Sequence, residues 1–212
     1  MAGYSTLTVE YSEGVGAITI DGSGPMNTLD VPTADDLHGA AIELSEDDAV
    51  RCITISGAGD AFGAGAGLPG MDGDASDAAR MRRTAGALHD AILQFHQAEK
   101  PVVTAVNGIA AGAGFSLALV GDLVLVSDDA RMDYAYQRMG LTGDGGSTFF
   151  LPRLVGLRKA KELLVLGEAI DPDRAVDLGL ATETVPADRL DERLSEVATR
   201  LADGPTRALG RT

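Results

Sequence analysis

The chain has 212 residues, of which 45% are hydrophobic, so it is long enough to bury a sizeable core and falls within the usual range of one domain, residues 1–212. Its 17 Lys and Arg residues against 32 Asp and Glu residues give a formal net charge of −15, which disfavours nucleic-acid binding because phosphates would be repelled. So acidic a surface also indicates a halophilic protein that stays folded and soluble in concentrated salt.

Membrane and disulfide chemistry are not indicated either. The longest apolar runs, such as residues 109–120, are interrupted by glycines and fall short of a membrane span, and residues 1–10 have no basic and apolar leader. We therefore expect a cytoplasmic protein with no membrane partner. The single cysteine, Cys52, lies in an apolar run, and we expect it to pack in a strand and to take no part in chemistry.

The first half of the chain alternates between strand and helix signals. Alternating or continuous apolar residues predict strands over residues 7–11, 17–20, 51–56 and 102–106, the first two forming a hairpin. Apolar residues at helical spacing predict one helix that ends near Leu44, with Thr33 and Asp36 spaced as its capping box, and a second helix over residues 75–98. Residues 57–74 are expected to form one long loop of small residues.

The second half repeats the same order of elements. A small-residue turn at residues 108–114 leads into a predicted helix over 115–120 and a strand over 123–126. Further helices are expected over residues 158–166, from Asp171-Pro172 onward, and over the amphipathic stretch 186–202, with a short strand at 181–185. Repeated units of strand, glycine turn and helix predict a layered α/β fold whose turns gather on one side.

The first small-residue turn, residues 57–68, follows a strand, so backbone must approach some other group closely there. Its match to a dinucleotide fingerprint, Gly65-x-Gly67-x-x-Gly70, contains Pro69 where a helix should open. We therefore disfavour a dinucleotide site.

The second small-residue turn, Asn107 to Leu117, runs from a strand into a helix N-terminus, where unpaired N–H groups favour negative charge. If both turns offered an amide to one point, they would form an oxyanion hole able to stabilise an enolate. Close helix packing that only glycine and alanine permit explains the same residues equally well.

Four segments in order resemble the successive signatures of the crotonase superfamily, the enoyl-CoA hydratase/isomerase family. They are residues 61–68, 107–114, 140–147 and 151–156, followed by a similar stretch at 175–181. The resemblance covers nearly the whole chain. It implies a spiral of repeated ββα units, an acyl-CoA thioester substrate and a homotrimer or hexamer, and it suggests that the usual C-terminal trimerisation helices are short or largely absent from this chain.

The resemblance also assigns residues to the site. By this resemblance, Ala66 and Ala113 donate the two backbone amides of the oxyanion hole, and Ala64, Ala66 and Gly112 belong to the CoA-binding set. Hydratases of the family carry two glutamates where this chain has Ser116 and Tyr136.

The departure at those two positions shifts attention to another acid. Neither serine nor tyrosine ionises near neutral pH, so hydration by two carboxylates is not expected. Asp144 is the remaining acid in this neighbourhood, and related isomerases and dehalogenases use an aspartate at this place of the motif. The alternative for Asp144 is a structural role as N-cap of a helix that starts near Ser147.

Other polar residues give weaker signals. Ser116 lies one residue away from a nucleophile elbow, because Ala118 stands where glycine is required, so a thioester hydrolase is a minor alternative. His89 and His96 share a helix without a third ligand nearby, and we assign no metal. Tyr134 and Tyr136 fit either the wall of an acyl pocket or a half-buried strand pair.

The mechanism that needs only one carboxylate is a double-bond shift in an enoyl-CoA. In this hypothesis Asp144 removes a proton next to the thioester, Ala66 and Ala113 stabilise the enolate, and no cofactor is needed beyond the CoA of the substrate. The alternatives are an enoyl-CoA hydratase with atypical acid and base residues, and a non-catalytic acyl-CoA binder.

Overall fold

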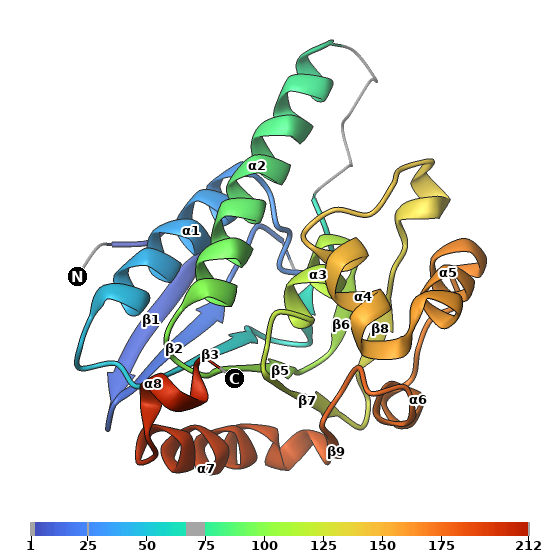
Figure 1. Ribbon diagram of the computed structural model, residues 1–212. Helices are drawn as coiled ribbons and strands as arrows, with labels where there is room; N and C mark the ends of the chain where they lie inside the picture. The colour runs from blue at the N-terminus through green and yellow to red at the C-terminus, as the bar shows by residue number, and fades with distance from the viewer. Residues whose placement is uncertain (1–2, 25, 67–74, 212) are drawn as a thin grey trace.

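The computed structural model describes residues 3–24, 26–66 and 75–211, which form a layered α/β structure (Figure 1). One sheet has six strands in the order β1-β2-β3-β5-β7-β9, and a smaller sheet has three strands in the order β4-β6-β8. The six strands are β1 (Leu7–Ser12), β2 (Val15–Ile20), β3 (Cys52–Gly57), β5 (Val102–Val106), β7 (Leu123–Ser127) and β9 (Glu183–Val185). The hairpin of β1 and β2 is antiparallel and every other pairing is parallel.

The second sheet explains the repeated unit. Its strands are β4 (Ala61–Gly63), β6 (Ile109–Ala111) and β8 (Arg131–Asp133), and each follows a strand of the large sheet. Each pair then leads into a helix: α2 (Ala75–Gln97), α3 (Ala113–Ala118) or, after the short helix η1 (Tyr136–Met139), α4 (Ser147–Val155). The predicted series of ββα units is therefore confirmed.

The three short strands correct two predictions. Residues 61–63 form β4 inside the segment expected to be one loop, and residues 109–111 form β6 inside the segment expected to be a turn. Both strands are short and rich in small residues, so they carry no alternation that could signal a strand. Residues 67–74, which hold the rest of that predicted loop and the second half of the fingerprint-like match, lie outside the described residues.

The helices cover the large sheet on both faces (Figure 1). On one face α1 (Val31–Glu46) packs along α2, and on the opposite face α7 (Leu190–Ala202) crosses β3, β5 and β7. The remaining helices lie in the second half of the chain: α5 (Leu157–Leu166), α6 (Pro172–Asp177), η2 (Ala187–Arg189) and α8 (Thr206–Leu209). The helix predicted from residue 186 thus begins at 190, after η2.

The N-terminus of α1 differs from the predicted capping box. The N-cap residue is Asp30 and not Thr33. The side chain of Asp30 accepts a hydrogen bond from the N–H of Thr33 at 3.2 Å, and Pro32 occupies the first turn. Asp36 accepts four hydrogen bonds from Ser5 and Thr6, because the chain before β1 passes beside α1. The capping-box prediction was wrong because the Asp36 carboxylate binds Ser5 and Thr6, which are distant in the sequence, and does not cap its own helix.

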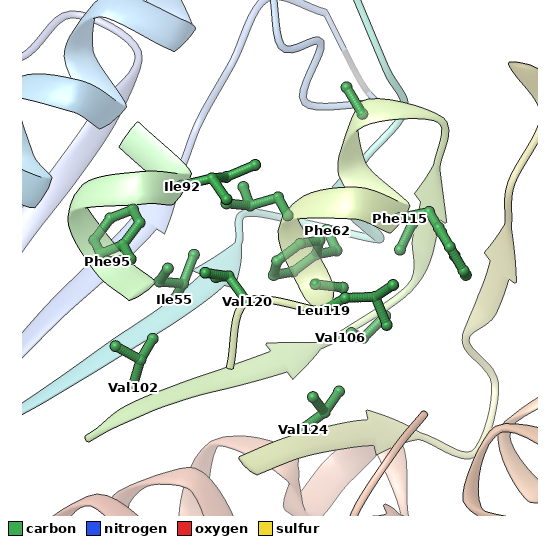
Figure 2. Close-up of a cluster of buried hydrophobic side chains, with 14 of the residues drawn as sticks. Ile55, Phe62, Ile92, Phe95, Val102, Val106, Phe115, Leu119, Val120 and Val124 are labelled. Atoms are coloured by element: carbon green, nitrogen blue, oxygen red, sulfur yellow. The ribbon is translucent and has the colours of Figure 1, made fainter. Parts of the chain in front are cut away.

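The main core lies between the large sheet and the helices α1, α2 and α3. Figure 2 shows Ile92 and Phe95 of α2 facing Phe62, Leu119 and Val120 across this core. Phe62, Phe95 and Phe115 are among its largest fully buried side chains. Burying a side chain of this kind contributes about 1.5–3 kcal/mol each, so the core fixes α2 and α3 against the strands that precede them.

Candidate active site

The two small-residue turns meet where β4 and β6 end. The Cα of Gly65 lies 3.8 Å from where a Cβ would stand on Gly112, and a Cβ on Gly114 would lie only 1.9 Å from the carbonyl oxygen of Gly63. Gly65 and Gly112 have φ of 82° and 54°, a conformation that favours glycine. Glycine is therefore required because two backbones touch, which is the close approach that the sequence indicated.

Hydrogen bonds hold both turns in place. The N–H of Ala64 donates to the carbonyl of Met26 at 2.9 Å, and the carbonyl of Gly65 accepts from Leu29 at 2.8 Å. The N–H of Gly112 donates to the carbonyl of Asp133 at 2.9 Å. The backbone N–H groups of Ala64 and Gly112 thus serve the turns themselves, and the predicted part of these residues in CoA binding stays a prediction.

Ala66 and Ala113 follow these two turns. Ala113 is the first residue of α3, and Ala66 comes directly after Gly65. Within residues 3–24, 26–66 and 75–211, no backbone carbonyl accepts a hydrogen bond from the N–H of either alanine. Both amides are therefore available to a ligand as far as the described chain is concerned, and their assignment to an oxyanion hole remains a prediction.

Ser116, Tyr136 and Asp144 form one hydrogen-bonded cluster beside α3. The phenol of Tyr136 donates a short hydrogen bond to the Asp144 carboxylate, and the Ser116 hydroxyl lies 3.2 Å from the same phenol oxygen. Ser116 is fully buried, Tyr136 is 8% exposed and Asp144 is partly buried. The structure therefore brings together the aspartate and the two residues expected at the positions of the family's glutamates.

A strained turn aims Tyr136 at this cluster. Ala135 has a φ of 56°, which is rare for a residue other than glycine, and the buried carboxylate of Asp133 accepts its N–H at 3.0 Å. Arg138 pairs with the other oxygen of that carboxylate at 2.8 Å. Because the carbonyl of Asp133 also binds Gly112, this turn is tied directly to the turn before α3.

Burial dominates the acid–base behaviour of Tyr136. Burial, followed by the negative charge of Asp144 and the hydrogen bond to it, raises the pKa of Tyr136 well above its ordinary value of 10.0. The phenol is therefore protonated at neutral pH and acts as a donor to Asp144. It is unsuited to replace a glutamate as a proton-transfer group near neutral pH.

The backbone of Asp144 is fixed as well as its side chain. Its carbonyl accepts from the N–H of Ser147 at 3.0 Å and from the Ser147 hydroxyl at 2.8 Å. The residue before α4 is Gly146, and no side chain caps that helix. Asp144 therefore does not cap α4 with its carboxylate, so the alternative structural role was wrong.

Tyr134 packs against Tyr136 of the cluster, and this aromatic pair differs from one prediction. Tyr134 and Tyr136 are both buried, and their ring centroids lie 4.9 Å apart at an interplanar angle of 52°. They follow β8 and are not part of it, so they are not a strand pair. The rings form a buried wall next to Asp144, and their contact with an acyl chain stays a prediction.

His89 is a member of the site that sequence reasoning missed. Its Nε2 accepts a hydrogen bond of 2.8 Å from the N–H of Gly145, the residue after Asp144. His96 instead lies edge-on to Phe149 and Phe150. No local pattern could single out His89, because it lies 56 residues before Gly145 and only the packing of α2 brings the two together.

The described residues contain no group of three or more His, Cys, Asp and Glu side chains suited to hold a metal ion. Among the same residues, no helix has the length and apolar character needed to cross a bilayer. A groove of about 580 Å³ lies elsewhere, lined by the ends of α1, α2 and α8, and it includes neither Asp144 nor Tyr136. The Asp144 cluster is the better site candidate because it holds a partly buried carboxylate linked through Tyr136 to Ser116 of α3, the helix that begins at Ala113.

Comparison with known proteins places these features in a family. The family model described as enoyl-CoA hydratase/isomerase matches residues 10–211. A probable enoyl-CoA hydratase of Rhodobacter capsulatus is 35% identical over 206 residues, covering 97% of this chain and 78% of that protein. The 1,2-epoxyphenylacetyl-CoA isomerase of Escherichia coli is 31% identical over 204 residues, covering 93% of this chain and 76% of that enzyme.

Solved structures agree on the fold. The crystal structure of an enoyl-CoA hydratase from Mycobacterium avium subsp. paratuberculosis superposes with a TM-score of 0.89 at 31% identity, covering 100% of this chain and 84% of that one. The predicted crotonase-like fold is thereby confirmed. The chain belongs to the enoyl-CoA hydratase/isomerase family, the crotonase superfamily of enzymes that its motifs resemble.

Proposed function

We propose that this enzyme shifts a double bond along the acyl chain of an enoyl-CoA thioester. The observation that carries the proposal is the hydrogen-bonded chain that runs from the Ser116 hydroxyl through the Tyr136 phenol to the Asp144 carboxylate. These two residues stand where the sequence resemblance expects the glutamates of a hydratase. One carboxylate held by a protonated phenol suits a reaction that moves a proton and adds no water.

The reaction balances with Asp144 as the only acid and base. Asp144 removes a proton from the carbon next to the thioester carbonyl of a 3-enoyl-CoA, and the electron pair forms a dienolate. The same carboxyl then returns the proton two carbons further along the chain. The double bond moves from carbons 3 and 4 to carbons 2 and 3, and nothing else enters or leaves.

The dienolate places negative charge on the thioester oxygen, and we assign its stabilisation to the N–H groups of Ala66 and Ala113. The touching glycines of the two turns support this assignment, because they keep the residues that follow them close together. Each preorganised donor of this kind contributes about 2.7–4 kcal/mol to the stability of the transition state.

The relatives support an acyl-CoA substrate and leave the reaction to experiment. The Escherichia coli relative is named an isomerase of a CoA thioester, and an isomerisation adds no water to its substrate. The Rhodobacter capsulatus relative is named a probable enoyl-CoA hydratase, which favours hydration as the second candidate. Because the phenol of Tyr136 stays protonated, Ser116 or a bound water would take the role of the missing glutamates in that reaction.

Three further properties belong to this proposal. The CoA part of the substrate is the only cofactor that the reaction requires. The loop around Ala64 helps to hold the adenine end of the CoA, with Ala66 and Gly112 in the same set. The active assembly is a homotrimer or hexamer, which sedimentation of the purified protein would check.

The deciding experiment is turnover of a 2-enoyl-CoA and a 3-enoyl-CoA in high salt by the wild type and by Asp144→Asn. Asparagine keeps an oxygen that accepts from Tyr136 and removes the base, so we expect isomerisation to fall by about 10²–10⁴-fold while CoA ligands still bind. Hydration that survives in Asp144→Asn would refute the assignment. Ligand binding without any turnover by the wild type would instead support a non-catalytic binder.

A further inference from the structure

The segment after Asp144 depends on hydrogen bonds for its conformation. Gly145 and Gly146 both lie in the left-handed region, with φ of 56° and 77°. Glycine adopts this region freely but also loses the most conformational entropy when it is fixed. A Cβ on Gly145 would stand 2.7 Å from the Cβ of Ser116, so no larger residue can stiffen the segment.

The peptide group between Asp144 and Gly145 is held at both ends. Its carbonyl oxygen accepts from the N–H and the hydroxyl of Ser147, at 3.0 and 2.8 Å. Its N–H donates to Nε2 of His89 at 2.8 Å. Because a peptide group is planar, fixing both ends sets the orientation of the Asp144 Cα and hence the direction in which its side chain leaves the backbone.

His89 is a rigid anchor although its side chain is exposed. It lies in the 23-residue helix α2, whose neighbouring positions Leu88 and Ile92 are buried in the main core. Ile92, one turn along the helix from His89, would contact a Cβ on Gly145 at 3.3 Å. The ring presents Nε2 to the loop, and this nitrogen accepts the hydrogen bond from the Gly145 N–H.

We propose that His89 is a positioning residue for Asp144. By accepting the Gly145 N–H it orients the peptide group that carries the catalytic carboxylate, while Tyr136 holds the carboxylate itself. His89 touches no reacting atom in this scheme. The inference rests on the proposed function, in which Asp144 is the base.

The test compares two replacements of His89. His89→Leu removes the acceptor, and we expect kcat for isomerisation to fall by about 10–100-fold with KM within about twofold, because misplacing a catalytic group by even 1 Å is costly. His89→Gln places Oε1 as many bonds from the Cα as Nε2, so it should recover kcat to within about fivefold of the wild type. His38→Leu on α1 makes the same substitution away from the site and should leave kcat unchanged.

A second readout does not depend on turnover. Amide exchange at Gly145, followed by NMR, should become at least about tenfold faster in His89→Leu and stay near the wild-type rate in His89→Gln. Equal kcat in His89→Leu and the wild type, or an equal loss in His89→Leu and His89→Gln, would overturn the inference.

The two proposals fail in different ways. A wild-type protein that does not isomerise any enoyl-CoA contradicts the proposed function, and the exchange rate at Gly145 then decides the positioning contact alone. Faster exchange in His89→Leu supports that contact. Unchanged exchange overturns it, whatever the activity.

Discussion

The two turns of the site touch at Gly114, so a methyl group added there would force their backbones apart. In Gly114→Ala the new Cβ would lie 1.9 Å from the carbonyl oxygen of Gly63. A carbon–oxygen contact needs roughly 3.3 Å, so the two backbones would have to separate by about 1.4 Å. Overpacking of this kind costs about 1–3 kcal/mol, which corresponds to a fall in Tm of about 2–12 °C for a chain of this size.

The same separation would damage the proposed oxyanion hole. It moves the turn that ends in Ala66 away from the turn that ends in Ala113, and a displacement of about 1 Å costs on the order of 10²-fold in rate. We therefore expect kcat of Gly114→Ala to fall by about 10²-fold. The assays are thermal unfolding by circular dichroism and isomerisation of a 3-enoyl-CoA under identical salt.

A glycine elsewhere provides the matched control. Gly86 lies in α2 with no atom within 4 Å of an added Cβ, so Gly86→Ala should stabilise the protein by up to about 1 kcal/mol and leave kcat unchanged. A Gly114→Ala variant with wild-type kcat and Tm would refute the argument that backbone contact between the turns sets the site. A lower Tm with wild-type kcat would mean that the contact stabilises the fold but does not position the catalytic groups.

Three further predictions concern ionisation and charge. Because burial and then the charge of Asp144 raise the pKa of Tyr136, the unfolded chain loses this proton first. Ionisation of Tyr136 should thus leave the free energy of unfolding unchanged below about pH 10 and lower it above that pH by up to ~1.4 kcal/mol per pH unit. Chemical denaturation should show a smaller decrease in Tyr136→Phe. Burial, followed by the charge of Asp122, raises the pKa of Cys52 to about 12, so the native thiol should resist alkylation at pH 8 and react only on unfolding, as mass spectrometry would show. With a net charge of −15, the protein should gain Tm between salt-free buffer and 1 M salt as repulsion is screened, and an unchanged Tm would contradict the halophilic interpretation.

The elements that could be predicted are those whose periodicity is local. The buried strand Val102–Val106 and the helix over residues 75–97 agree with the sequence to within one residue, because apolar runs and helical spacing are sufficient signals. The strands β4, β6 and β8 were not predicted, since three residues of mixed character become strands only through pairing with one another.

Some residues of the candidate site could likewise be predicted from the sequence, and others could not. Asp144, Ser116 and Tyr136 were selected from motif positions, and the structure joins them in one cluster. His89 could not be predicted, because its hydrogen bond with Gly145 depends on how α2 packs against the segment after Asp144. Asp36 shows the converse case, since its carboxylate fits a local cap in the sequence but binds Ser5 and Thr6 in the fold.

The large sheet packs against two separate hydrophobic clusters, and the candidate site lies on the side of only one of them. Along β5, Val102 and Val106 point into the core that carries the site, whereas Val103 and Ala105 join a second cluster beneath α7. Free-energy changes at distant sites without shared partners add nearly independently. Directed evolution could therefore repack the α7 side for heat or low salt and leave the catalytic turns as they are.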